Sequence, residues 1–136
     1  MKPHRVLLIE DDPLEATLAK RTLLHINKEI EVVRLRDGAH FLKYYKDNRP
    51  VKDVSLAIMD LHMPRIDGFG VLKVLQDNDE RTPFPIVMFS SSEDQEEIAK
   101  AYDLGATAFV NKPTAPKPYR AAMEHIVNFW LNVNRR

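Results

Sequence analysis

Short runs of apolar residues alternate along this chain with longer segments in which apolar residues recur every three or four positions. The runs span residues 6–9, 30–33, 54–59, 86–89 and 108–110. Most of them are apolar throughout, which is typical of parallel strands that are covered on both faces. The intervening segments have the apolar spacing of helices that bury one side. The pattern therefore predicts five strands, each followed by a helix.

This order of elements predicts an α/β fold, a doubly wound parallel sheet, because right-handed crossovers place helices on both faces of the sheet. A chain of 136 residues has the size of one domain. At this size, folding buries roughly two-thirds of the chain's surface. The sequence contains no internal repeat, low-complexity tract or linker. We therefore expect residues 1–136 to form a single domain without a separate output domain.

Residues at the predicted helix ends indicate where the helices begin and stop. Asp12 is suited to cap the first helix, with Glu15 three residues later as the second half of a capping box, worth about 1 kcal/mol. Ser92 and Gln95 have the same spacing before the fourth helix. Gly105 is suited to end that helix, because glycine readily adopts the left-handed conformation found there.

Charge and composition exclude several classes of function. Lys plus Arg and Asp plus Glu number 20 each, so no net field attracts the protein to nucleic acid or to an anionic membrane. The lack of cysteine excludes disulfides, thiolate catalysis and cysteine-ligated zinc. The first apolar run is too short for a signal peptide, and no segment reaches membrane-spanning length. We expect a cytoplasmic protein that binds neither nucleic acid nor membrane.

Polar residues gather where the predicted strands end, most clearly in the segment 58-IMDLHMPRIDGFG-70. Asp60 ends the third strand, Glu10 and Asp11 follow the first, Ser90 ends the fourth, and Lys112 follows the fifth. The carboxyl ends of parallel strands share one edge of the sheet. Clustered carboxylates repel one another unless a cation neutralises them, and Mg²⁺ prefers such oxygen ligands. The set predicts a phosphoryl-transfer site with Asp60 as its candidate nucleophile.

Taken singly, each of these residues has an ordinary structural explanation. Asp60 alone would be read as a loop or capping aspartate. Lys112 alone would be a solvated lysine before a turn-forming proline, and Ser90 would belong to a polar capping loop. Phe109 would be a core aromatic residue. Only their combination at four strand ends favours a chemical role.

Four motifs in chain order resemble the receiver domain of response regulators in two-component signalling: 10-ED-11, 60-DLHMPRIDG-68, Ser90 and 112-KP-113. The resemblance covers nearly the whole chain. It implies a flavodoxin-like (βα)5 fold with the strand order 2-1-3-4-5. It also implies a phosphoprotein that catalyses only its own phosphorylation and dephosphorylation, and not an enzyme that acts on other substrates.

The same resemblance implies a role for each site residue. Asp60 would accept a phosphoryl group from a phosphohistidine of a partner protein. Mg²⁺ would be bound by Asp11, Asp60 and the backbone carbonyl of His62, with Glu10 acting through a water molecule. Lys112 would pair with the phosphoryl oxygens.

Further residues of the resemblance concern switching and the lifetime of the phosphoryl group. Ser90 would move to hydrogen-bond a phosphoryl oxygen, and Phe109 occupies the aromatic position that turns inward at that moment. Phenylalanine lacks the tyrosine hydroxyl common at this position, so a switch there would be a packing event. His62 and Ser92 would flank the path of the hydrolytic water and tune how long the phosphoryl bond lasts.

Two other functions fit parts of the same pattern. Mg²⁺-dependent phosphatases with a nucleophilic aspartate use a similar sheet, but they typically carry a second aspartate two residues later, where this chain has His62. A pseudo-receiver that only binds a partner would not need the complete set of acids, hydroxyl and lysine. We therefore favour a phosphoacceptor response regulator over both alternatives.

The expected partners are a sensor histidine kinase or a phosphotransfer protein of a phosphorelay. The segments 37-DGAHFL-42, 90-SSSEDQEE-97 and 129-FWLNVN-134 resemble single-domain regulators that pair with phytochrome-type kinases. Residues 116–136 predict one final helix. Its apolar arc is broader than one sheet face requires, since Val127, Phe129 and Leu131 lie beside the main stripe, and it favours a homodimer through this helix.

Overall fold

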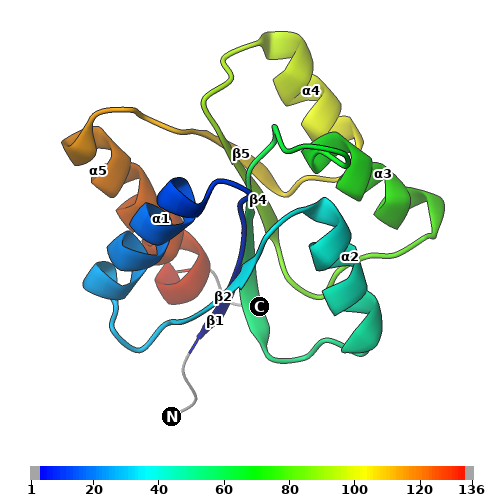
Figure 1. Cartoon of the computed structure of the whole chain (residues 1–136), viewed down its shortest axis with the longest axis horizontal. Coiled ribbons are helices and arrows are strands. Elements are labelled where there is room, and N and C mark those ends of the chain that lie inside the picture. Colours follow the sequence, from blue (N-terminus) through cyan, green and yellow to red (C-terminus); the bar gives the residue numbers. More distant parts are fainter. Residues whose placement is uncertain (1–3, 134–136) are drawn as a thin grey trace.

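The computed structural model describes residues 4–133, which form a five-stranded parallel sheet flanked by helices on both faces (Figure 1). The strand order is β2-β1-β3-β4-β5, as the resemblance implied. The strands are β1 (Arg5–Ile9), β2 (Glu31–Leu35), β3 (Val54–Met59), β4 (Ile86–Ser90) and β5 (Ala108–Asn111). The predicted fold class is confirmed. The main difference is β2, which extends two residues further than its apolar run because Arg34 and Leu35 continue the pairing with β1.

The helices form two layers. In Figure 1, α1 and α5 lie together on one side of the sheet, and α2, α3 and α4 lie on the other. The helices are α1 (Pro13–Ile26), α2 (Gly38–Asp47), α3 (Gly68–Asp77), α4 (Gln95–Asp103) and α5 (Pro116–Val127). Two apolar cores result, one on each face of the sheet, and alternate strand residues contribute to each of them. The central strands β1, β3 and β4 are thus buried on both faces.

The helix starts follow the predicted capping residues only in part. Asp12 caps α1 by accepting from the backbone N–H of Leu14 at 2.9 Å, as expected. The prediction that Glu15 completes the capping box is wrong, because its side chain accepts a hydrogen bond from Lys112 instead. Ser92 as the cap of α4 is also wrong, since Asp94 holds that position.

Two glycines occupy positions where a side chain would strain the backbone or clash with neighbouring atoms. Gly105 follows α4 with φ +105°, which confirms the predicted helix end. Gly68 begins α3 where that helix touches the sheet. A Cβ atom at Gly68 would lie 3.2 Å from the carbonyl oxygen of Asp60 and 3.1 Å from the Cα of Leu61. The absence of a side chain there lets α3 pack directly against the end of β3.

The C-terminal segment is not the single regular helix expected from its sequence. Helix α5 ends at Val127, and residues Asn128–Val133 continue as a wider π-helical turn. The turn lets Trp130 and Leu131 pack against the core on the face shared with α1. Among the described residues, none of the helices has the length and apolar character needed to cross a membrane.

Candidate functional site

The polar residues predicted to form the site are held by backbone hydrogen bonds that extend the sheet beyond its strands. The amide of Glu10 donates to the carbonyl of Leu35 at 3.1 Å, and that of Asp60 donates to Ile9 at 3.0 Å. The amide of Lys112 donates to the carbonyl of Ser90 at 2.7 Å. Each side chain is thus positioned by the ladder of the neighbouring strand. Rigid placement of this kind favours pre-organised chemistry.

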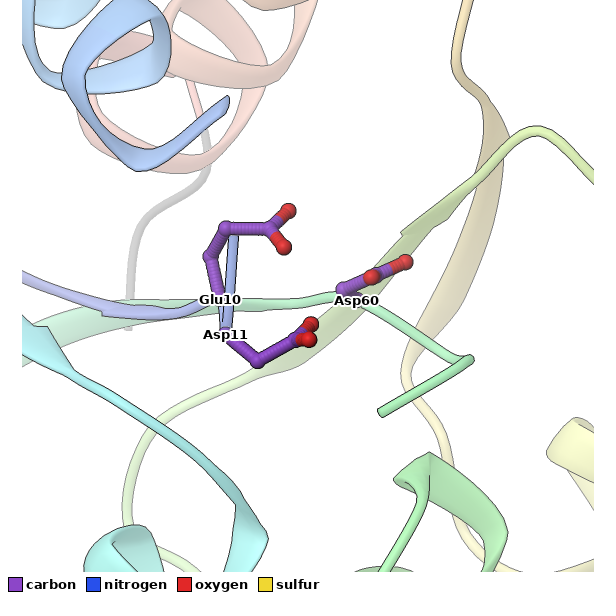
Figure 2. Close-up of side chains that lie close together, drawn as sticks. All are labelled: Glu10, Asp11 and Asp60. Carbon is purple, nitrogen blue, oxygen red and sulfur yellow. The ribbon is translucent and has the colours of Figure 1, made fainter. Parts of the chain in front are cut away.

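Three carboxylates meet at the carboxyl edge of β1 and β3. One oxygen from each of Glu10, Asp11 and Asp60 lies within 4.8 Å of the others. Figure 2 shows Glu10 and Asp11 as consecutive residues after β1, with Asp60 beside them at the end of the adjacent strand. Glu10 is buried, whereas Asp11 and Asp60 are half-buried. The predicted acidic cluster is therefore present in the fold.

The surroundings of Glu10 and Asp60 oppose the ionisation of these two carboxyl groups. Burial and the nearby charge of Asp60 raise the pKa of Glu10 to about 7. Burial likewise raises the pKa of Asp60, and the charges of Glu15 and Asp11 add to the increase, although Lys112 opposes it. A divalent cation between the carboxylates would relieve both repulsion and desolvation.

Lys112 supplies positive charge to this cluster. Its Nζ lies 3.3 Å from Oε1 of Glu10, 3.2 Å from Oε1 of Glu15 and 3.8 Å from Oδ1 of Asp60, and its side chain is 12% exposed. Burial alone would lower the pKa of Lys112, but the charges of Asp60, Glu10 and Glu15 raise it above its usual value. The ammonium therefore stays charged and is shared by three carboxylates.

Glu15 is a site residue that the sequence reasoning missed. Its spacing after Asp12 indicated a capping role, yet its carboxylate pairs with Lys112 from the first turn of α1. The two residues are 97 positions apart in the chain. Only the packing of α1 beside the loop after β5 brings Glu15 and Lys112 together. No local sequence pattern predicts such a contact.

Ser90 and Phe109 lie on the two strands at the β4–β5 side of the site. Ser90 is completely buried, and its Oγ accepts from the amide of Ser92 at 3.2 Å. Phe109 is half-buried and packs against the core beneath α4. Its backbone N–H donates to the hydroxyl of Tyr102 at 3.0 Å. A tyrosine hydroxyl thus contacts position 109 from α4, although residue 109 itself has none.

His62 and Ser92, the two residues that the resemblance relates to phosphoryl lifetime, share one partner. Oε1 of Glu97 lies 3.4 Å from Nε2 of His62 and accepts from Oγ of Ser92 at 2.5 Å. His62 follows β3, Ser92 follows β4 and Glu97 lies in α4. This Glu97 bridge was not predicted from the sequence.

A pocket of about 440 Å³ opens beside these groups. Asp60, Lys112 and His62 line it together with Glu15 from α1. Lys112 beside Asp60 in this lining provides positive charge for a small anionic group.

Comparison with protein families agrees with this fold. Residues 6–124 match the family described as the response regulator receiver domain. The chain belongs to this family. The receiver-domain assignment confirms the resemblance seen in the sequence motifs.

Several known receiver domains are similar over almost their whole length. The response regulator Rcp1 of Synechocystis sp. is 24% identical over 132 residues, covering 95% of this chain and 90% of Rcp1. The phosphorylated cyanobacterial phytochrome response regulator RcpA superposes with a TM-score of 0.87 at 24% identity, covering 98% of this chain and 97% of RcpA. The bacteriophytochrome response regulator AtBRR is 31% identical, with a TM-score of 0.72, over 99% of this chain and all (100%) of AtBRR.

Proposed function

We propose that this receiver domain is the phosphoacceptor of a two-component system and that Asp60 receives the phosphoryl group. An Asp60 carboxylate oxygen forms the bond to phosphorus, and the donor's phosphorus–nitrogen bond to histidine breaks. The electron pair of that bond stays on the imidazole, which takes up a proton. The observation that carries this proposal is that Asp60 and Lys112 line one pocket with their charged atoms 3.8 Å apart, while Glu10 and Asp11 lie beside Asp60.

Lys112 and Ser90 have distinct parts in the proposed reaction. The ammonium of Lys112 faces Asp60 and compensates the charge that accumulates on phosphoryl oxygens. Ser90 provides a hydroxyl at the end of β4, and moving it toward the phosphoryl group requires release of its contact with the amide of Ser92. Phe109 lies on the adjacent strand, so repacking of its ring would accompany that movement.

The acidic cluster fits Mg²⁺ as the proposed cofactor. Asp11 and Asp60 would bind it directly with the carbonyl of His62, and Glu10 would act through water, because Mg²⁺ favours a few carboxylates and retains several waters. When bound, Mg²⁺ would neutralise negative charge on the transferred group. The buried carboxylates and the raised pKa of Glu10 indicate a site that gains from such a cation.

Mg²⁺ should raise the melting temperature more at pH 8 than at pH 6. Glu10 has a pKa of about 7, so it carries a proton at pH 6 and is ionised at pH 8. At pH 6 a cation must displace the proton of Glu10 to bind, whereas at pH 8 there is no proton to displace. Thermal unfolding with and without Mg²⁺ at both values measures the difference. An equal shift at both pH values would contradict the assigned role of Glu10.

We further propose a histidine kinase of the phytochrome type, or a phosphotransfer protein, as the phosphoryl donor. The likeness to a bacteriophytochrome response regulator, at 31% identity over almost both whole chains, supports this partner. The chain would act through contacts with other proteins. It would catalyse only its own phosphorylation and dephosphorylation. The cytoplasmic location expected from the sequence stays a prediction.

Incubation with acetyl phosphate and Mg²⁺, followed by intact mass measurement, separates this function from its alternatives. A receiver domain gives a single phosphoryl adduct. An aspartate-nucleophile phosphatase consumes the donor without keeping an adduct, and a pseudo-receiver leaves both protein and donor unchanged. His62 occupies the position of the phosphatase's second aspartate, which favours the first outcome.

The homodimer through the C-terminal helix also stays a prediction. Fewer exposed apolar residues support it in the structure than the sequence indicated. Val127 is buried and Leu131 packs against the core, so neighbouring elements cover both. Phe129 remains 50% exposed, and Val133 lies where no side chain is described. Sedimentation at micromolar concentration should show a dimer that Phe129→Asp converts to a folded monomer. A monomeric wild-type protein, with and without phosphoryl donor, would exclude this interface.

A further inference from the structure

The Glu97 bridge connects three separate elements beside the pocket. The carboxylate of Glu97 is 28% exposed and accepts from Oγ of Ser92, while the same oxygen, Oε1, lies 3.4 Å from Nε2 of His62. The hydroxyl of Ser92 also accepts from the amide of Asp94 at 3.3 Å, which leaves its proton directed to Glu97. A single carboxylate oxygen thus contacts side chains from two different loops.

These two loops approach the reacting centre from adjacent strands. His62 lies two residues after Asp60 and lines the same pocket. Ser92 lies two residues after Ser90, and its amide is bonded to the hydroxyl of Ser90. The side chain of His62 is 57% exposed, and Glu97 is a polar partner that restricts its rotamers. An exposed histidine held by a half-buried carboxylate adopts a narrower range of positions than a free one.

We propose that Glu97 is a positioning residue that sets the lifetime of the phosphoryl group by holding His62, which lines the pocket with Asp60, and Ser92, which is bonded to Ser90. This inference rests on the proposed phosphorylation of Asp60. Glu97 touches neither the carboxylate of Asp60 nor the transferred group, and it acts only through its two partners.

Hydrolysis explains why their position matters. A water oxygen forms a bond to phosphorus while the bond from phosphorus to the Asp60 oxygen breaks. The electron pair returns to the carboxylate, a proton of the water is released to solvent, and inorganic phosphate leaves. The water must approach in line with the breaking bond, from the side opposite Asp60. Side chains fixed beside that path exclude water more completely than mobile ones.

Replacing Glu97 with alanine should therefore shorten the phosphoryl lifetime. The protein is labelled with acetyl phosphate and Mg²⁺, the donor is removed, and the first-order loss of the mass adduct is followed. Glu97→Ala should lose the phosphoryl group about tenfold faster than wild type, the factor that corresponds to one hydrogen bond to a charged group. Glu97→Gln retains an oxygen acceptor for Ser92 and should restore most of the lifetime.

Two controls separate positioning from a general effect on α4. Glu96→Ala removes an exposed carboxylate from the same first turn of the helix and should leave the lifetime unchanged. In a protein that already carries His62→Ala and Ser92→Ala, the further change Glu97→Ala should have no effect, because both partners are gone. Circular dichroism establishes that each variant is folded.

The outcomes are distinguishable. A wild-type lifetime in Glu97→Ala overturns the inference while leaving Asp60 phosphorylation intact. Equal acceleration by Glu96→Ala, or a full effect of Glu97→Ala without His62 and Ser92 side chains, also overturns it, since charge at the helix terminus would then be the cause. Failure of the wild-type protein to form any adduct refutes the proposed function itself.

Discussion

Asp60→Asn should form no phosphoryl adduct under conditions that label the wild-type protein completely. The amide nitrogen of asparagine cannot take part as a carboxylate oxygen does, and its neutral carbonyl is a poor nucleophile. The substitution preserves shape, so the ladder bond from the Asp60 amide to Ile9 should persist and the fold should remain. Intact mass after treatment with acetyl phosphate and Mg²⁺ measures the result.

Asp12→Asn is the matched control for this experiment. Asp12 lies in the same loop as the acidic cluster, but it caps α1, and asparagine caps helices about as well as aspartate. This variant should be labelled at the wild-type rate. Labelling of Asp60→Asn at that rate would disprove the assignment of Asp60 and would require another acceptor.

Lys112→Ala should reduce the stability of the metal-free protein as well as block the response to phosphorylation. Taken singly, Lys112 had the sequence context of a solvated lysine, and the loss of such a residue costs little stability. The structure instead places its ammonium, 12% exposed, against Glu10, Glu15 and Asp60. Removing one partner of a buried ion pair costs about 3–5 kcal/mol, and we expect about 1–3 kcal/mol at this partly exposed edge.

The stability that Lys112→Ala loses should be larger at high pH than at low pH. In the wild-type protein Glu10 is ionised above pH 7, and Lys112 helps to lower its pKa. Without Lys112 the ionised form of Glu10 loses this stabilisation and faces Asp60 unpaired. Below pH 7 Glu10 binds a proton, so the difference between variant and wild type should shrink as the pH falls. Denaturant unfolding at pH 6 and pH 8 measures it, with Lys73→Ala, which breaks only an exposed pair on α3, as control. Equal losses at both pH values would contradict this explanation.

The hydrophobic pattern was sufficient to predict the sheet and the meeting of its polar ends. Continuous apolar runs followed by Asp60 or by Glu10 and Asp11, with helical segments between them, favour parallel strands, and parallel strands end on the same side of the sheet. The strand order did not follow from the pattern, because every βα unit has similar spacing. It came from the resemblance.

Contacts between helices and loops could not be predicted in the same way. Glu15 and Glu97 each occupy the third residue of a helix, where a capping interaction is the usual local expectation. Both instead contact residues of distant segments, and only the rotation of α1 and α4 against the sheet decides this. Local spacing also favoured Ser92 as a cap, while the choice of Asp94 freed the serine hydroxyl for Glu97.

The hydrogen bond from the Phe109 amide to the Tyr102 hydroxyl has a mechanical consequence. It attaches α4 to the main chain of β5 and leaves the phenylalanine ring untouched. The ring takes no part in this hydrogen bond, so it can change rotamer without breaking the bond. A shift of the β5 backbone at Phe109, by contrast, would act on Tyr102 of α4 through this bond. In the proposed switch, the ring of Phe109 and its backbone would therefore act on different neighbours.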